Sequence, residues 1–181
     1  MVSRKISVVL VTLLLATAVT APAWAKKSLP AVNDEGMELV KDSKLATVYA
    51  DPGADLSIYS KVWLKDATVA FRKNWQRDQN RGVSSLRVKT SDMERIQESV
   101  ATTFREVFTQ ELIDGGYELA EEAGPDVLMV SPAIIDLDVH APDVRGASRV
   151  YSYSESAGEM TLKLELFDSI TNDKVARAAD R

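Results

Sequence analysis

The stretch from residue 72 to residue 89 carries the most unusual concentration of charge in the chain. It holds six cations against one acidic residue, Asp78. The cations are Arg72, Lys73, Arg77, Arg81, Arg87 and Lys89. If residues 72–81 were helical, three of these side chains would stack at i, i+4 and i+8, where like charges repel. A bound anion would relieve that repulsion, so the cluster favours contact with an anionic ligand or an acidic partner.

Five residues form the candidate contact site for such a partner. They are Arg72, Lys73, Trp75, Arg77 and Arg81. Arginine and tryptophan together are typical of residues that anchor an interface. The alternative interpretation is a solvated loop whose charge merely offsets an acidic domain. Taken alone, Trp75 is more typical of a core or half-buried residue.

A second candidate site combines Asp136, Asp138 and His140. Strand alternation would place all three on one face, with Leu137 and Val139 on the other. Two carboxylates and an imidazole can bind a divalent metal or share proton transfer. The spacing is not specific, because alternating polar residues are also how a strand faces water. The three residues are therefore a candidate active site of a hydrolase, and no metal site is assigned to them.

Other signals of catalysis are missing from the sequence. No serine lies in a nucleophile-elbow pattern, and His140 is the only imidazole that could act as a base for one. Gly115-Gly116 ends a predicted helix instead of opening one, so it does not form a phosphate-cradling loop. We therefore expect a protein that is not an enzyme and has no catalytic residue, metal or cofactor.

The clearest predicted element is a long amphipathic helix that begins at Ser91 and ends at Ile113. Apolar residues recur there at steps of three to five and form one stripe, with charged residues mostly on the other face. Ser91 and Glu94 have the spacing of a capping box. Gly115-Gly116 stops the helix.

Eight segments are predicted to be strands. They are residues 37–41, 45–50, 62–71, 117–120, 126–139, 149–154, 159–168 and 174–179. We expect a bend near residues 65–67, and Pro132 predicts an edge position or a bulge because proline cannot donate to a ladder. The predicted fold class is α+β: two layers, a mainly antiparallel sheet packed by the one long helix. Because the chain stops at Arg181 in what is predicted to be mid-strand, we expect its C-terminus to be truncated.

The first 25 residues have the three-part layout of a secretory signal peptide. A basic start is followed by an apolar run over residues 6–19 and by Ala23-Trp24-Ala25, so cleavage is expected after Ala25. The alternative is an uncleaved anchor, although the apolar run is shorter than the roughly 20 residues that a spanning helix needs. Residues 26–36 are then a flexible lead and residues 37–181 a single α+β domain. The expected location is the periplasm, with no transmembrane segment after cleavage.

Composition limits the classes of function. The chain has no cysteine, which excludes disulfides, thiol-ligated zinc and a lipid carried on cysteine. Residues 1–25 hold two of the 22 basic residues and none of the 27 acidic ones, so the remaining chain has 20 basic and 27 acidic residues, a net charge of −7. Such an acidic domain is a poor general binder of nucleic acid, so we expect no nucleic-acid partner.

Several short segments follow the order seen in one family. They are residues 48–56, Tyr59, and residues 69–75, 115–117, 126–128 and 166–171. In these segments the chain resembles DUF3313, a family of bacterial envelope proteins of unknown function. Most members are lipoproteins, and the missing cysteine is a departure from that pattern. The resemblance implies an envelope location and an α+β fold, and it supplies no activity, ligand or site residue.

Together these observations predict an exported envelope protein that acts as a non-catalytic binding or assembly module. Its partner would be an envelope protein or an anionic envelope component. One alternative is an envelope hydrolase that uses Asp136, Asp138 and His140. The other is a structural homo-oligomer, which would need a contiguous exposed apolar patch.

Overall fold

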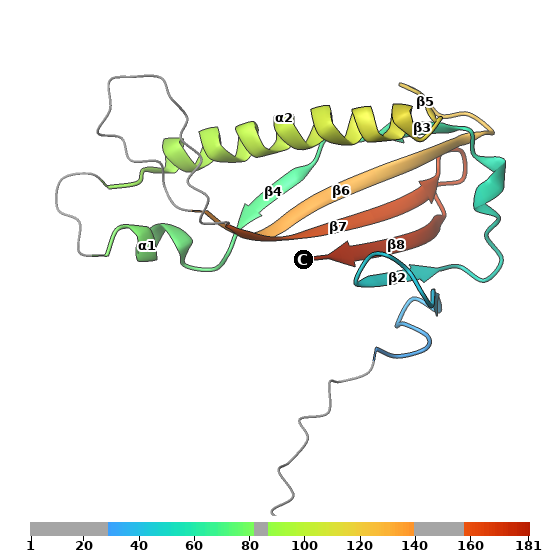
Figure 1. Cartoon of the computed structure of the whole chain (residues 1–181), viewed down its shortest axis with the longest axis horizontal. Helices are drawn as coiled ribbons and strands as arrows, with labels where there is room; N and C mark the ends of the chain where they lie inside the picture. Colours follow the sequence, from blue (N-terminus) through green and yellow to red (C-terminus); the bar gives the residue numbers. More distant parts are fainter. Residues whose placement is uncertain (1–28, 82–86, 140–157) are drawn as a thin grey trace, which may run out of the picture.

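A single eight-stranded sheet with one long helix forms the body of the protein (Figure 1). The structure is a computed structural model, which describes residues 29–81, 87–139 and 158–181. The strands are β1 (Glu38–Leu39), β2 (Thr47–Ala50), β3 (Lys61–Leu64), β4 (Thr68–Phe71), β5 (Glu118–Leu119), β6 (Val127–Asp138), β7 (Glu159–Asp168) and β8 (Lys174–Asp180). The helices are η1 (Leu56–Ile58), α1 (Trp75–Gln79) and α2 (Thr90–Asp114).

The sheet is mixed, with β6 at its centre. The strand order is β1-β2-β8-β7-β6-β3-β5, and β4 also pairs with β6 beyond the end of β3. The four pairings from β1 to β6 are antiparallel, whereas the three that involve β3, β4 and β5 are parallel. The parallel side arises because α2 carries the chain from β4 back along the sheet before β5 begins. The predicted α+β fold with one long helix is thus confirmed, with antiparallel pairs in a small majority.

Pro132 lies inside the central strand, and the prediction of an edge or bulge position was wrong. Val130 accepts the N–H of Lys65 at 2.9 Å, so Pro132, two residues on, directs its nitrogen to the same side. On that side β3 stops pairing at Leu64 and β4 starts at Thr68, opposite Ala133. The missing N–H therefore faces the break between two partner strands, where no ladder hydrogen bond is lost.

The sheet buries one face of β6 through a regular alternation that breaks near its end. Val130, Pro132 and Ile134 are buried, and then Asp136 is exposed with a φ of 54°. The register with β7 also shifts between Ile135 and Asp138. This irregularity brings Leu137 into the core, so the alternation that buries Val130, Pro132 and Ile134 does not continue to Asp136.

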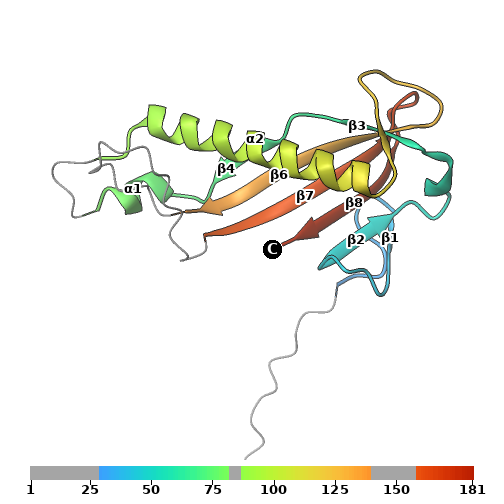
Figure 2. The same cartoon turned by 45° about the horizontal axis from the view of Figure 1, so that its top comes forward.

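Helix α2 covers the β3–β4–β6 side of the sheet (Figures 1 and 2). Its residues Phe108 and Leu112 pack against the buried cluster around Val62 and Val130. The Gln97 side-chain amide donates to the Val69 carbonyl at 2.6 Å and so covers part of the outer edge of β4.

The N-terminal cap of α2 differs from the predicted one by two residues. The helix begins at Thr90, and the Asp92 carboxylate accepts the N–H of Lys89 at 2.8 Å. Asp92, and not the Ser91–Glu94 pair, therefore satisfies the cap, and its charge suits the positive end of the helix dipole. At the other end Gly116 has a φ of 86°, which explains why glycine stops the helix there.

Residues 30–36, which belong to the predicted flexible lead, contact the sheet. The Pro30 carbonyl accepts the hydroxyl of Tyr49 at 3.0 Å, and Val32 bridges to Glu38. Glu35 forms ion pairs with Lys174 and Arg177 of β8, at 2.7 and 3.0 Å. This segment is therefore joined to β1, β2 and β8.

Several other predicted segments differ in detail. Strand β7 has the predicted bounds, and residues 62–71 divide into β3 and β4 at the predicted bend. Helix α1 was not predicted as a separate element. The leader (1–25) and the predicted strand at residues 149–154 lie outside the described residues.

Candidate functional site

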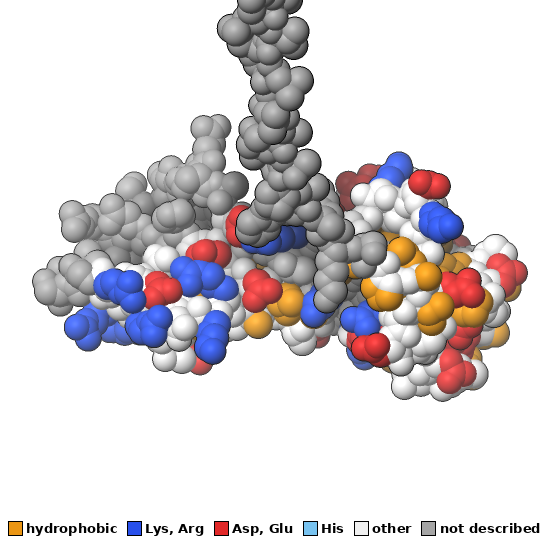
Figure 3. Space-filling view, turned by 90° about the horizontal axis from the view of Figure 1, so that it is seen from below, with side chains coloured by type: hydrophobic (Ala, Val, Ile, Leu, Met, Phe, Trp, Pro, Cys, Tyr) orange, Lys and Arg blue, Asp and Glu red, His pale blue; other side chains and the backbone are white. Residues whose placement is uncertain are grey.

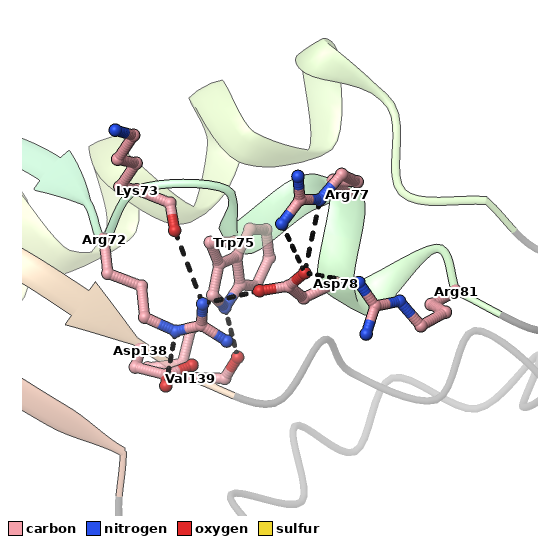
Figure 4. A network of polar contacts seen from close by, with 8 residues as sticks. All are labelled: Arg72, Lys73, Trp75, Arg77, Asp78, Arg81, Asp138 and Val139. Atoms are coloured by element: carbon pink, nitrogen blue, oxygen red, sulfur yellow. Dashed lines mark hydrogen bonds and ion pairs between the residues drawn. The ribbon is translucent and has the colours of Figure 1, made fainter.

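The cationic stretch is built around helix α1, which Trp75 holds to the end of the sheet (Figure 4). Trp75 is 1% exposed and stacks on Phe71 with a ring-centroid distance of 4.2 Å. Its indole N–H donates to the Val139 carbonyl at 2.8 Å, just beyond β6. Trp75 is thus a packing residue, and the prediction that it would contact a ligand was wrong.

Arg72 connects this helix to the sheet through two carboxylates. Its Nε donates to Asp138 Oδ2 at 2.6 Å, and its Nη1 donates to Asp78 Oδ2 at 2.8 Å. The hydrogen bonds to Asp78 and Asp138 raise the pKa of the guanidinium above its ordinary value. Both of these donors are engaged inside the protein, so Arg72 positions α1 more than it presents charge to solvent.

Asp78 also forms ion pairs with the two exposed arginines Arg77 and Arg81. Its Oδ1 atom lies 3.4 Å from Arg77 Nη2 and 3.7 Å from Arg81 Nη2. The side chains of Arg77 and Arg81 are 65% and 75% exposed. Hydrogen bonding to Arg72, followed by Arg77, lowers the pKa of the Asp78 carboxyl. Asp78 therefore remains ionised at neutral pH and holds two like charges close together at the surface.

Two further cations lie beside α1 because Val88 is hydrogen-bonded to it. The Val88 carbonyl accepts the side-chain amides of Gln76 and Asn80 at 3.1 and 3.0 Å, and Val88 N–H donates to Asn80 Oδ1 at 2.7 Å. The neighbours Arg87 and Lys89, one on each side of Val88, are both exposed.

We call this surface the cationic end. Its members are the exposed cations Lys73, Arg77, Arg81, Arg87 and Lys89. Figure 3 shows Lys and Arg side chains gathered at the end of the molecule that carries α1. Within the cationic end, Lys73 directs its ammonium group away from Asp78, as Figure 4 shows. Of the predicted cations, the structure therefore brings Arg72, Arg77 and Arg81 together and leaves Lys73 apart.

Sequence patterns did not predict that three further residues, Asp138, Gln76 and Asn80, belong to the network around α1. Asp138 was placed in a separate site, and nothing local indicates that it faces Arg72, 66 residues away. The amides of Gln76 and Asn80 gave no signal either. Their shared spacing of four residues on a short helix could have suggested a common partner, because residues i and i+4 lie on one helix face.

The candidate group of Asp136, Asp138 and His140 is not assembled by the described residues. Asp138 is paired with Arg72, Asp136 is exposed where the register shifts, and His140 lies outside the described residues. In the described part of the chain, no three His, Cys, Asp or Glu side chains are grouped so that they could hold a metal ion.

The opposite end of the molecule is acidic. The last turn of α2 and the segment after it carry the exposed residues Glu111, Asp114, Glu118, Glu121 and Glu122. Helix α2 runs from the cationic end to this acidic end, and its 25 residues span about 37 Å at 1.5 Å per residue. The cationic end and this acidic group therefore lie at opposite ends of α2.

A third surface feature is apolar. Leu29, Val40 and Leu45 are 47%, 42% and 36% exposed, and they line one open hollow of ≈ 370 Å³ beside the β1–β2 hairpin. Figure 3 shows apolar side chains on the part of the surface away from α1. No helix among the described residues has both the length and the apolar character that crossing a membrane requires.

The fold and this surface define an α+β domain with a mixed sheet, one long helix and a cationic end built on a short second helix. Residues 30–181 match the model of a family described as a protein of unknown function, DUF3313. The chain belongs to that family, as its sequence resemblance indicated. Comparisons with curated proteins and with solved structures gave no match.

Proposed function

We propose that this protein is a non-catalytic binding module of the bacterial cell envelope, exported by a cleaved leader, which attaches to an anionic envelope component through its cationic end. One observation carries the proposal: exposed cations gather at α1 in a chain that carries more acidic than basic residues. Three carboxylates at this end are already paired within the protein, since Asp78 and Asp138 pair with Arg72 and Asp92 with Arg95.

Charge separation allows an acidic protein to approach an anionic surface in one orientation. The cations of the cationic end meet the surface first, while Glu118, Glu121 and Glu122 point away at the far end of α2. Exposed charges farther apart than a Debye length, about 8 Å at physiological ionic strength, are largely screened from each other. The surface would therefore interact mainly with the cationic end.

The proposal is tested by sedimenting the protein, expressed with its leader and purified after export, with isolated envelopes at increasing ionic strength. We expect retention at about 0.01 M salt and release towards about 1 M, as the Debye length falls from about 30 Å to about 3 Å. Retention that salt does not change would contradict an electrostatic attachment, and so would the absence of retention at the lowest salt.

Self-association is a second candidate function, because Leu29, Val40 and Leu45 expose apolar side chains around one hollow. Such a surface would be covered if two copies met there. Gel filtration with light scattering tests this directly: Val40→Ser with Leu45→Ser should convert an oligomer to a monomer. A wild-type protein that is already monomeric at high concentration would exclude this candidate.

A further inference from the structure

Arg77, Arg81 and Asp78 form an arrangement more specific than a patch of positive charge. Asp78 divides its two oxygens: Oδ2 binds Arg72 at 2.8 Å, and Oδ1 faces Arg77 and Arg81 at 3.4 and 3.7 Å. The contact to Arg72 is short and belongs to the anchoring of α1. The two contacts at Oδ1 are long, and the guanidinium groups that make them extend into solvent (Figure 4).

We propose that Arg77 and Arg81 form a clamp for the headgroup phosphates of an anionic phospholipid surface, with Asp78 as the positioning residue. This inference rests on the proposed function and names the ligand chemistry of the same site. A guanidinium presents planar pairs of N–H donors that match phosphate oxygens in a bidentate way, which an ammonium cannot do. Without Asp78, two guanidinium groups one turn apart would repel and separate.

The spread of the cationic end favours a surface over a small soluble anion. One phosphate can engage Arg77 and Arg81, but Lys73, Arg87 and Lys89 are also exposed at this end. Two open hollows of the described chain lie elsewhere, one beside the β1–β2 hairpin and one along residues 118–127. A spread group of exposed cations gains more from many phosphates in one plane, because each Lys or Arg near an anionic membrane adds to the attraction.

The first experiment measures binding of the protein, purified after export and removal of its leader, to vesicles of three compositions. One is phosphatidylcholine alone, one contains phosphatidylglycerol, and one contains oleate, a carboxylate, at a matched zeta potential. The clamp predicts tighter binding to phosphatidylglycerol than to oleate and little binding to phosphatidylcholine. Inorganic phosphate is added as a competitor: the inference predicts no loss beyond that caused by sodium chloride of equal ionic strength, and a larger loss would assign the clamp to the soluble ion instead.

The second experiment distinguishes the positioning role of Asp78 from the effect of its negative charge. Asp78→Asn removes a negative charge, so charge alone predicts tighter binding to both anionic vesicles. The clamp predicts weaker binding to phosphatidylglycerol and loss of the preference over oleate, because Arg77 and Arg81 are no longer held together. Asp138→Asn is the matched control, since it removes the same charge and one of the two carboxylate partners of Arg72 while leaving Asp78 in place. This control should keep the preference for phosphate.

The outcomes distinguish the two proposals. Equal binding of the wild-type protein to phosphatidylglycerol and oleate vesicles would overturn the clamp and leave the anionic attachment standing. Tighter binding by Asp78→Asn would also overturn the clamp. Loss of preference in both aspartate variants would assign the effect to loosening of α1, and that result too overturns the positioning role. Failure to bind either anionic vesicle, together with no salt-sensitive retention on envelopes, would overturn both proposals.

Discussion

The guanidinium of Arg72 and the carboxylate of Asp138 lie 66 residues apart in the chain, yet 2.6 Å separates Nε from Oδ2. This pair joins the segment between β4 and α1 to the end of β6. Two groups that the sequence indicates as separate candidate sites, the cationic stretch and the acidic strand end, are therefore parts of one network. In that network Asp138 is a structural partner, and Arg77 and Arg81 are the charges left at the surface.

The anchoring of α1 by Trp75 gives a prediction about stability. Trp75→Ala should lower the free energy of unfolding by about 3–5 kcal/mol, as for other buried large aromatic residues. Trp75→Phe keeps a ring to stack on Phe71 and leaves the Val139 carbonyl without its donor, which should cost about 1–3 kcal/mol. Urea denaturation measures both. Trp63→Phe, at a half-buried position, is the control and should cost less; an equal cost in the control would contradict the anchoring role.

Tyr59 gives a prediction about alkaline pH. Burial, together with a hydrogen bond to Asp168 at 2.9 Å, raises the pKa of the Tyr59 hydroxyl from 10.0 to about 12. Because the folded state holds the proton more tightly, this contribution to stability is complete below about pH 10 and is lost as the pH rises towards about 12. The free energy of unfolding of the wild-type protein should therefore fall more steeply over this range than that of Tyr59→Phe. Parallel curves for the two proteins would exclude the effect.

The charge of the cationic end gives a prediction about attachment. Each Lys or Arg near an anionic surface contributes about 1 kcal/mol, so Arg77→Ser with Arg81→Ser should weaken binding to anionic vesicles or envelopes about 30-fold. Lys41→Ser with Lys44→Ser removes the same charge from exposed positions on the β1–β2 hairpin and serves as the matched control. Co-sedimentation at fixed low salt compares the two. Equal losses would mean that net charge, and not its position, determines attachment.

Export gives a prediction that mass spectrometry can check. If the leader is removed after Ala25, the protein purified from the periplasmic or envelope fraction begins at Lys26. Replacing Ala23 and Ala25 by bulky residues should block processing and leave the larger form. A product that retains Met1 in the cytosolic fraction would contradict export and the envelope role with it.

Local patterns in the sequence predicted the regular parts of the fold. The 3.6-residue period gave α2 to within one residue at each end, because a long amphipathic stripe has few alternative structures. Alternating Leu162, Leu164 and Leu166 gave the bounds of β7. Both signals depend only on neighbours in sequence, which explains why they were reliable.

The other features of the fold and of the candidate site depend on tertiary contacts, which the local sequence pattern does not indicate. From the sequence alone, Pro132 predicts an edge strand. In the structure β3 and β4 both pair with the same side of β6, and the gap between these two strands lies opposite Pro132. Which face of β6 the side chains of Asp136 and Asp138 occupy depends on the register shift between Ile135 and Asp138, and no residue type in that segment predicts the shift. The charged neighbours of Trp75 favour an interface anchor, whereas contacts with Phe71 and the Val139 carbonyl hold it in the buried position that its residue type alone favours.

The orientation of the bound protein tests the central proposal most directly, and the absence of cysteine makes the measurement simple. Single cysteines introduced by Ser91→Cys at the start of α2 and by Ala123→Cys beyond its far end can each carry one fluorophore without a change of charge. On binding to anionic vesicles or envelopes, the label at position 91 should become shielded from a water-soluble quencher, while the label at position 123 stays accessible. Shielding at position 123 alone, or equal shielding at both positions, would contradict attachment through the cationic end.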